Sequence, residues 1–161
     1  MKLKVLFLCN HNSARSQMAE GLLRFLYGEK YEVFSAGASP TSINPLTIKV
    51  MAEIGIDISK QYSKSIEEFR NKEIDLVVTV CTSSLKVTCP FCSSPLGEKP
   101  QIIELTLPKA KHYIHHGFRE PSTGKSEEEQ LASFRQVRDE IKKWITNNFA
   151  YLKIENIDNI K

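Results

Sequence analysis

The sequence lacks any apolar run that approaches the length needed to cross a bilayer, so no membrane-spanning helix and no membrane partner are expected. Its first apolar run, residues 5–8, is too short for the core of a signal peptide, and no small-residue cleavage site follows it. We therefore expect an intracellular, cytoplasmic protein. In that compartment its four cysteines are expected to be reduced, reactive or metal-bound rather than joined in structural disulfides.

A strong charge of either sign is also missing. The 22 Lys and Arg residues stand against 19 Asp and Glu, which leaves a formal charge of +3 spread evenly along the chain. A nucleic-acid-binding protein usually gathers its basic residues in a patch or stripe, so no nucleic-acid partner is expected. This charge balance fits a small anionic substrate better.

With 161 residues, of which 41% are hydrophobic, the chain is long enough for one well-filled core and too short for two domains. We expect a single domain over residues 1–148 and a C-terminal tail over residues 149–161. Apolar runs typical of buried strands alternate with segments of helical periodicity. The expected strands cover residues 5–8, 31–36, 76–80 and 101–105, and the expected helices begin near Ser16, Asn44, Ile66 and Ser126.

This alternation predicts an α/β fold with a parallel sheet, whose ligand site lies at the carboxyl ends of the strands. Two of the expected strands end on a cysteine, Cys9 and Cys81. Between residues 82 and 111, five prolines and glycines interrupt the pattern, and this segment is interpreted as a functional insert. The sequence thus places two thiols at the edge of the sheet where substrates bind.

Residues 9–16 carry a cysteine, five intervening residues, an arginine and a serine between a strand and a helix. Such a loop points backbone N–H groups and a helix dipole at one spot, which binds an oxyanion and favours the thiolate of Cys9. Arg15 can offer a planar fork of donors, Ser16 can donate its hydroxyl to the Cys9 sulfur, and Asn12 tolerates a left-handed backbone. The residues expected to hold the oxyanion are Asn10, His11, Asn12, Ser13, Ala14 and Arg15.

Several separated blocks resemble the arsenate reductases built on the low-molecular-weight protein tyrosine phosphatase fold. The blocks are CNHNSARSQMAEG at 9–21, FSAG at 34–37, MAEIGIDIS at 51–59, DLVVTVC at 75–81 and FRQVRDEI at 134–141. Because they agree in order over residues 3–148, the resemblance is far more specific than one short motif. It implies a three-layer α/β sandwich with a four-stranded parallel sheet.

The resemblance also implies a cysteine relay that thioredoxin, or a similar thiol reductant, regenerates. In that family the loop cysteine attacks arsenate, a second cysteine releases arsenite, and a third takes over the disulfide. By position these are Cys9, Cys81 and Cys89, with Cys92 as a possible substitute for Cys89. Reducing As(V) to As(III) needs two electrons, and forming one disulfide supplies two, so no cofactor and no metal are expected.

Two other functions remain open at this point. A phosphatase that hydrolyses phosphate monoesters needs only Cys9, but residues 39–44 contain no aromatic side chain and Pro121 is followed by Ser122 rather than tyrosine, which disfavours phosphotyrosine. A zinc- or arsenic-binding module would use Cys81, Cys89 and Cys92. It would add a histidine from His112, His115 or His116.

Two positions depart from the family pattern. The family places an aspartate before the proline of a loop near the active site, whereas this chain has Glu120 before Pro121, and we expect Glu120 to act as an imperfect general acid. Some relatives also hold potassium through four residues, three of which match Asn12, Glu20 and Ser35. The fourth position is Lys64, whose ammonium is predicted to pair with Glu20 in place of the cation.

Overall fold

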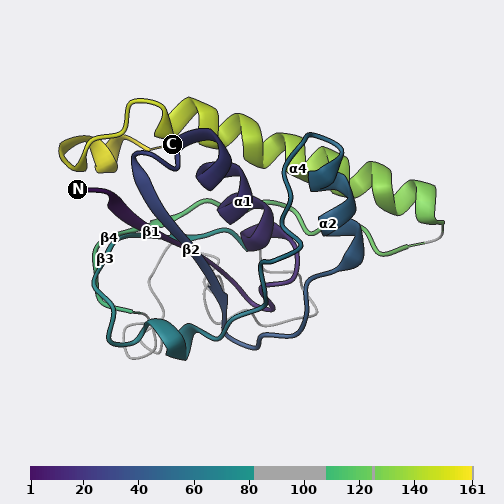
Figure 1. The fold of residues 1–161 in the computed structure, drawn as a ribbon, viewed down its shortest axis with the longest axis horizontal. Helices are drawn as coiled ribbons and strands as arrows, with labels where there is room; N and C mark the ends of the chain where they lie inside the picture. Colours follow the sequence, from purple (N-terminus) through teal and green to yellow (C-terminus); the bar gives the residue numbers. More distant parts are fainter. Residues whose placement is uncertain (82–107, 125, 161) are drawn as a thin grey trace, which may run out of the picture.

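The protein is described by a computed structural model that covers residues 1–81, 108–124 and 126–160. Its centre is a sheet of four parallel strands in the order β2-β1-β3-β4 (Figure 1). The strands are β1 (Leu3–Cys9), β2 (Tyr31–Gly37), β3 (Ile74–Thr79) and β4 (Ala110–His115). After β1 the chain adds β2 on one side and then β3 and β4 on the other, so the strand order reverses between β1 and β3. At such a switch point the carboxyl ends of the strands leave room for a ligand.

The helices α1 (Arg15–Tyr27), α2 (Pro45–Ala52) and α4 (Glu127–Phe149) pack on one another on one side of the sheet (Figure 1). Two residues of β2, three positions apart, show the two sides. The Tyr31 ring meets Phe149 of α4, with ring centroids 5.6 Å apart, whereas Phe34 meets Phe69 of the 3₁₀ helix η1 (Ile66–Phe69), at 5.5 Å, on the opposite face. The predicted four-stranded parallel α/β architecture is therefore confirmed.

Local signals explain where the helices begin and end. Asn44 caps α2 by accepting a hydrogen bond from the N–H of Leu46, and Pro45 occupies the first turn, as predicted. Ser126 accepts from the N–H of Glu129 at the start of α4. Beyond α2 the chain turns at Gly55, whose φ of +81° is one that glycine adopts without strain.

Core residues lie between the sheet and the three helices, and also on the opposite face, where Phe69 is buried. Leu6, Phe7 and Leu8 of β1 are fully buried, and α4 supplies Phe134, Ile141 and Phe149 from its inner face. Burial raises the pKa of Tyr31 to about 12, and its neutral hydroxyl donates to the Phe149 carbonyl at 2.7 Å. Because residues 5–9 of β1 are buried and β1 pairs with a strand on each side, Cys9 at the end of the strand has a fixed position.

The sequence did not predict β4, the fourth strand of the sheet. β4 covers residues 110–115, whereas the strand expected at 101–105 lies outside the described residues. β4 alternates between half-buried and exposed side chains, but Lys111, His112 and His115 hide this alternation in the sequence. The tail adds the 3₁₀ helix η2 (Ile154–Asn159), where Ile157 is buried. Among the described residues, no helix has the length and apolar character of a membrane span.

Candidate active site

The loop between β1 and α1 is the centre of the candidate site. β1 ends on Cys9 and α1 begins at Arg15, so the loop runs directly into a helix N-terminus, as predicted. Asn12 has the expected left-handed backbone, with a φ of 51°. Gly37 at the end of β2 lies against this loop, and a Cβ there would come within 2.6 Å of the Asn10 carbonyl oxygen. Only glycine permits this close approach of the two backbones.

A second segment, residues 38–44, runs along the outside of the Cys9 loop and forms hydrogen bonds with the backbone carbonyl groups of that loop. The N–H groups of Ala38, Ser39, Thr41 and Asn44 donate to the carbonyl oxygens of residues 9, 10, 11 and 13, at 2.8 to 3.3 Å. Because the carbonyl groups are turned outward, the N–H groups of the loop can point inward. The N–H of Asn12 does so, donating to Cys9 Sγ at 3.2 Å.

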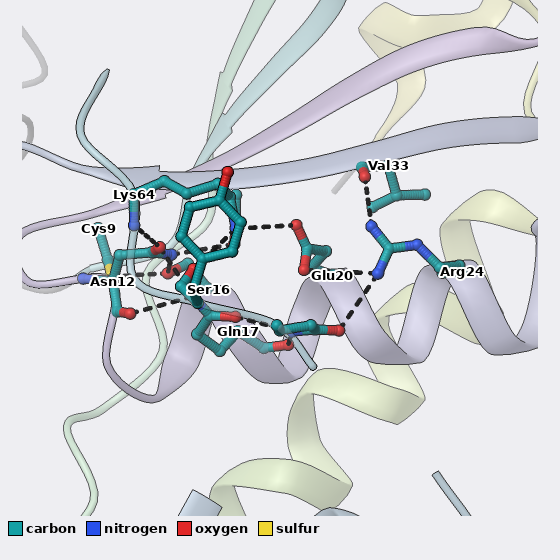
Figure 2. Close-up of polar contacts among 11 residues, drawn as sticks. Cys9, Asn12, Ser16, Gln17, Glu20, Arg24, Val33 and Lys64 are labelled. Carbon is teal, nitrogen blue, oxygen red and sulfur yellow. Dashed lines mark hydrogen bonds and ion pairs between the residues drawn. The ribbon is translucent and has the colours of Figure 1, made fainter. Parts of the chain in front are cut away.

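The Cys9 sulfur also contacts the Ser16 hydroxyl, at 2.9 Å (Figure 2). Ser16 Oγ accepts a hydrogen bond from Asn12 Nδ2 at 2.7 Å, so its own proton is available for the sulfur. This is the contact that the sequence predicted. Two hydrogen-bond donors, the Asn12 N–H and the Ser16 hydroxyl, therefore face the buried sulfur.

The side chain of Asn12 organises this arrangement. Its Oδ1 accepts from the backbone N–H of Lys64 at 2.9 Å, and because that group can only donate, the orientation of the amide is fixed. Its Nδ2 then faces Ser16 and the Ser35 hydroxyl, the latter at 3.0 Å. Asn12 is fully buried, so its role is internal rather than direct contact with substrate through its side chain.

A cavity of about 80 Å³ opens over Cys9. That volume is well below the several hundred Å³ typical of sites for drug-sized ligands, and it suits a small ion. Phe134 is the one Phe, Tyr or Trp side chain among the lining residues, and it belongs to the core. The residues that line the cavity are Cys9, His11, Ser13, Ala14, Arg15, Asn44, Glu120, Pro121, Thr123 and Phe134.

Glu120 and Pro121 reach this cavity on a segment that is anchored just before them, at residues 116–118. Arg15 Nη1 donates to the Phe118 carbonyl at 3.0 Å, and the Phe118 ring packs edge-on against Trp144 of α4. His116 stacks on the same Trp144, with ring centroids 4.8 Å apart. Burial, together with the charge of His115, lowers the pKa of His116, which favours a neutral ring in this stack. Glu120 is thus brought to the cavity that contains Cys9, as expected.

Cys81 lies at the same edge of the sheet. The register pairs Leu8 of β1 with Thr79 of β3, so Cys9 is level with residue 80 and Cys81 is one residue further along. Neighbouring strands are about 4.8 Å apart, which places the two thiols in the same region. Cys81 is buried, with 1% of its surface exposed.

The remaining predicted thiols, Cys89 and Cys92, lie outside the described residues. The three candidate histidines do not converge. His112 and His115 are three residues apart on β4 and so face opposite sides of the sheet, while His116 stacks on Trp144. Among the residues that the structure describes, no three His, Cys, Asp or Glu side chains gather in a way that could hold a metal ion.

Lys64 is buried beside the loop and pairs with Glu20, as predicted. Its Nζ lies 3.5 Å from Glu20 Oε1, and the two side chains are only 9% and 3% exposed. The ammonium also donates to the Tyr62 carbonyl at 2.9 Å and lies 4.7 Å from the centre of the Tyr62 ring. A fixed positive charge therefore faces Glu20, and we expect it to make a bound potassium ion unnecessary.

This pairing gives a prediction about cations. The wild-type protein should show the same melting temperature and activity in potassium as in sodium at equal ionic strength. Lys64→Met should lower the free energy of unfolding by about 2 to 4 kcal/mol, because it leaves Glu20 buried with one weaker partner, Arg24. Lys64→Asp should become stabilised by potassium over sodium in thermal unfolding.

A clear preference of the wild-type protein for potassium would contradict this prediction. Lys60, an exposed lysine nearby in the sequence, provides the control. Lys60→Met should change neither the stability nor the response to cations.

Sequence reasoning missed Gln17, which is fully buried and donates through Nε2 to Asn12 Oδ1 at 2.8 Å. The first two turns of α1 are buried on all sides, so helical periodicity cannot show which of their polar residues contacts the loop. It also missed Gln61, which joins Gln17 across 44 residues of sequence. A contact at that separation leaves no local pattern.

Comparison with known proteins agrees with this geometry. The model of the family described as low molecular weight phosphotyrosine protein phosphatase matches residues 4–157. An arsenate reductase of Halalkalibacterium halodurans is 41% identical over 142 residues, which cover 88% of this chain and 91% of that protein.

Solved structures are similar over most of the chain as well. An arsenate reductase in the phosphate binding state has a TM-score of 0.64 and 31% identity, with all of both chains covered. A thioredoxin-dependent arsenate reductase of Corynebacterium glutamicum has a TM-score of 0.55 and 26% identity, covering 91% of this chain and 61% of that one. The loop from Cys9 to Ser16 and these similarities together show that the chain belongs to the low molecular weight phosphotyrosine protein phosphatase family, in which it is similar to arsenate reductases.

Proposed function

We propose that this protein reduces arsenate to arsenite through the thiol of Cys9. One observation carries the proposal: a buried Cys9 sulfur, held by the Ser16 hydroxyl and the Asn12 N–H, opens into a cavity of about 80 Å³ that Arg15 and Glu120 also line. The curated relatives that are about 40% identical over most of the chain are arsenate reductases, which supports the same substrate. Phosphate, of the same shape and charge, is expected to compete for the cavity.

In the first step the Cys9 thiolate attacks arsenic, and one arsenate oxygen leaves as water after protonation. Arg15 uses one of its five N–H groups for the Phe118 carbonyl, and the others can bind two oxygens of the oxyanion. Backbone N–H groups of residues 10–14 and the N-terminus of α1 add further donors. The product is a covalent Cys9–arsenate adduct in which arsenic is still As(V).

In the second step Cys81 attacks the Cys9 sulfur. The Cys9–Cys81 disulfide forms, the sulfur–arsenic bond breaks, and its electron pair leaves with arsenic as arsenite. Cys89 then attacks Cys81, which frees the Cys9 thiol and moves the disulfide to Cys81 and Cys89. Two thiols are oxidised for each As(V) reduced to As(III), so the electrons balance without a cofactor.

Thioredoxin, or a similar dithiol reductant, is proposed to reduce the final disulfide. The Corynebacterium glutamicum protein of similar structure is thioredoxin-dependent, which supports this type of partner. Such a relay needs thiols that are kept reduced between turnovers, and we therefore place the protein in the cytoplasm. The catalytic unit is proposed to be residues 1–148, with residues 149–161 as a tail whose Phe149 and Ile157 pack into the core.

Hydrolysis of phosphate monoesters is a second candidate, since the family model is named after phosphatases and the reaction needs only Cys9 and an acid. The shape of the cavity predicts that this phosphatase activity is weak. Its lining residues include no Phe, Tyr or Trp side chain outside the core that could hold a phenyl group, and Ser122 follows Pro121. We expect aryl phosphates to be hydrolysed slowly and without preference for phosphotyrosine.

Glu120 is proposed to protonate the departing oxygen. Glu120→Gln should slow the first chemical step by about 10²-fold, at the low end for a general acid, because glutamate replaces the family's aspartate. It should also remove the limb of the pH–rate profile that requires a protonated carboxyl group. Rapid-mixing measurement of the Cys9 adduct reports the step directly, and Glu128→Gln, at an exposed position on α4, is the control. An unchanged rate and profile would remove Glu120 from the mechanism.

The proposed function is tested by following arsenate-dependent oxidation of reduced thioredoxin beside hydrolysis of an aryl phosphate. We expect thioredoxin oxidation to need both arsenate and the protein, with aryl phosphate turned over more slowly. Efficient phosphotyrosine hydrolysis with no arsenate turnover under any thiol system would favour the phosphatase instead.

A further inference from the structure

A chain of side-chain hydrogen bonds runs from the surface of α1 to the sulfur of Cys9 (Figure 2). Arg24 Nη1 donates to Gln61 Oε1 at 3.3 Å, and Gln61 Nε2 donates to Gln17 Oε1 at 2.7 Å. Gln17 Nε2 donates to Asn12 Oδ1 at 2.8 Å, Asn12 Nδ2 to Ser16 Oγ at 2.7 Å, and Ser16 Oγ contacts Cys9 Sγ. Five links thus connect a guanidinium group to the proposed nucleophile.

The direction of each link made by an amide side chain is fixed by groups that can act in only one way. Gln17 Nε2 also faces the carbonyl oxygens of Asn12 and Tyr62, at 3.1 and 3.0 Å, so its nitrogen must be on that side. Gln61 Nε2 faces the Gln17 carbonyl at 3.2 Å, and Gln61 Oε1 faces a guanidinium that only donates. Each amide therefore accepts on the side of Arg24 and donates on the side of Cys9.

Aligned hydrogen bonds polarise one another in a poorly solvated interior. A cation at the accepting end draws electron density from each amide in turn and makes the next N–H or O–H a stronger donor. We propose that Gln17 and Gln61 are positioning residues. Their hydrogen bonds, polarised by the positive charge of Arg24, strengthen the hydrogen bond from Ser16 to the Cys9 sulfur and so stabilise its thiolate. This inference rests on the proposed role of Cys9 as nucleophile.

The charges around the two ends of the chain fit this role. Arg24 is held by the Val33 carbonyl at 2.7 Å and by Glu20 at 3.5 Å. Glu20 is shared with Lys64, so one carboxylate faces two cations and a positive charge remains. At this outer end Asp57 and Glu68 add two negative charges and Lys60 and Lys72 add two positive ones, and all four line a common hollow with Arg24.

The charged or titratable groups in the cavity with Cys9 are His11, Arg15 and Glu120. Substitutions at the outer end leave all three in place. The effect of His11, Arg15 and Glu120 on the sulfur is therefore expected to cancel when variants are compared with the wild type.

The test is the pH dependence of alkylation of Cys9 by iodoacetamide in the full chain, followed by peptide mass spectrometry at fixed ionic strength. Gln61→Leu breaks the chain two links away from the loop and leaves Asn12 untouched. We expect the midpoint of its profile to rise by about 0.5 to 1 pH unit, the change that corresponds to losing one ordinary hydrogen bond. The rate at high pH, where every Cys9 is a thiolate, should stay the same.

Gln17→Leu should shift the midpoint in the same direction and by more, because it also removes the bonds to Asn12. Arg24→Met should shift it as Gln61→Leu does, and the double variant Arg24→Met/Gln61→Leu should add little, because both act through one chain. Gln136→Leu, at an exposed position on α4, is the matched control and should leave the profile unchanged.

Each result has one meaning. If the Gln61→Leu profile matches the wild type, and the wild-type midpoint lies below that of an ordinary cysteine, the relay is overturned and Cys9 is still supported as the nucleophile. A changed rate at high pH together with an unchanged midpoint would mean that Gln61 is only structural, which also overturns it. A wild-type Cys9 that titrates like an ordinary cysteine would instead contradict the proposed function.

Discussion

Cys9→Ser is expected to abolish arsenate reduction and phosphate ester hydrolysis together, with a loss of about 10⁴-fold or more in both rates. The serine hydroxyl is not ionised at neutral pH, and the donors around position 9 cannot change that. Binding should survive, because Arg15 and the N–H groups of the loop remain. The measurement is steady-state turnover of both substrates, with the rise in melting temperature on adding phosphate as the report of binding.

A matched control for this variant is Ser13→Ala, at another residue that lines the cavity. The Ser13 carbonyl, rather than its hydroxyl, makes the contacts with Asn44 and Thr47, so most activity should remain. If Cys9→Ser kept either activity at a comparable rate, the assignment of the nucleophile would be wrong.

Cys81→Ser is expected to allow the first step and no turnover. The Cys9–arsenate adduct should form, and arsenite should not be released, because no second thiol is placed beside Cys9 to accept its sulfur. Hydrolysis of an aryl phosphate, which needs only Cys9, should fall by less than about tenfold, within the range of a packing change. Rapid quenching followed by intact-mass measurement separates the two outcomes.

The same experiment orders the remaining thiols. Cys89→Ser should accumulate the Cys9–Cys81 disulfide, whereas Cys92→Ser should turn over almost normally. A dominant Cys81–Cys92 linkage in the oxidised wild type, or full turnover by Cys89→Ser with loss in Cys92→Ser, would reverse their roles.

The parts of the site that sequence could predict are those with local causes. A polar loop between an apolar run and a helix placed Cys9, Arg15 and Ser16 correctly, and the type of residue at position 12 indicated its left-handed backbone. The pairing of Lys64 with Glu20 followed from the resemblance rather than from spacing, and the structure confirms it.

The parts that sequence could not predict depend on contacts between distant segments. Residues 38–44 bond the outer side of the loop, and Gln61 reaches Gln17 from 44 positions away. The strand β4 lies at the edge of the sheet, and three of its residues, Lys111, His112 and His115, are basic. They break the apolar alternation that marks a strand. Polar residues that serve tertiary structure look the same in the sequence as polar residues that face solvent.

A single turnover without any external reductant tests the central claim most directly. Fully reduced protein is mixed with arsenate, and arsenite and free thiols are counted while the new disulfide is mapped. We expect close to one arsenite per chain, the loss of two thiols, and a disulfide that involves Cys81. Release of no arsenite with all thiols intact, from protein that still hydrolyses an aryl phosphate, would contradict arsenate reduction and identify the site as a phosphatase.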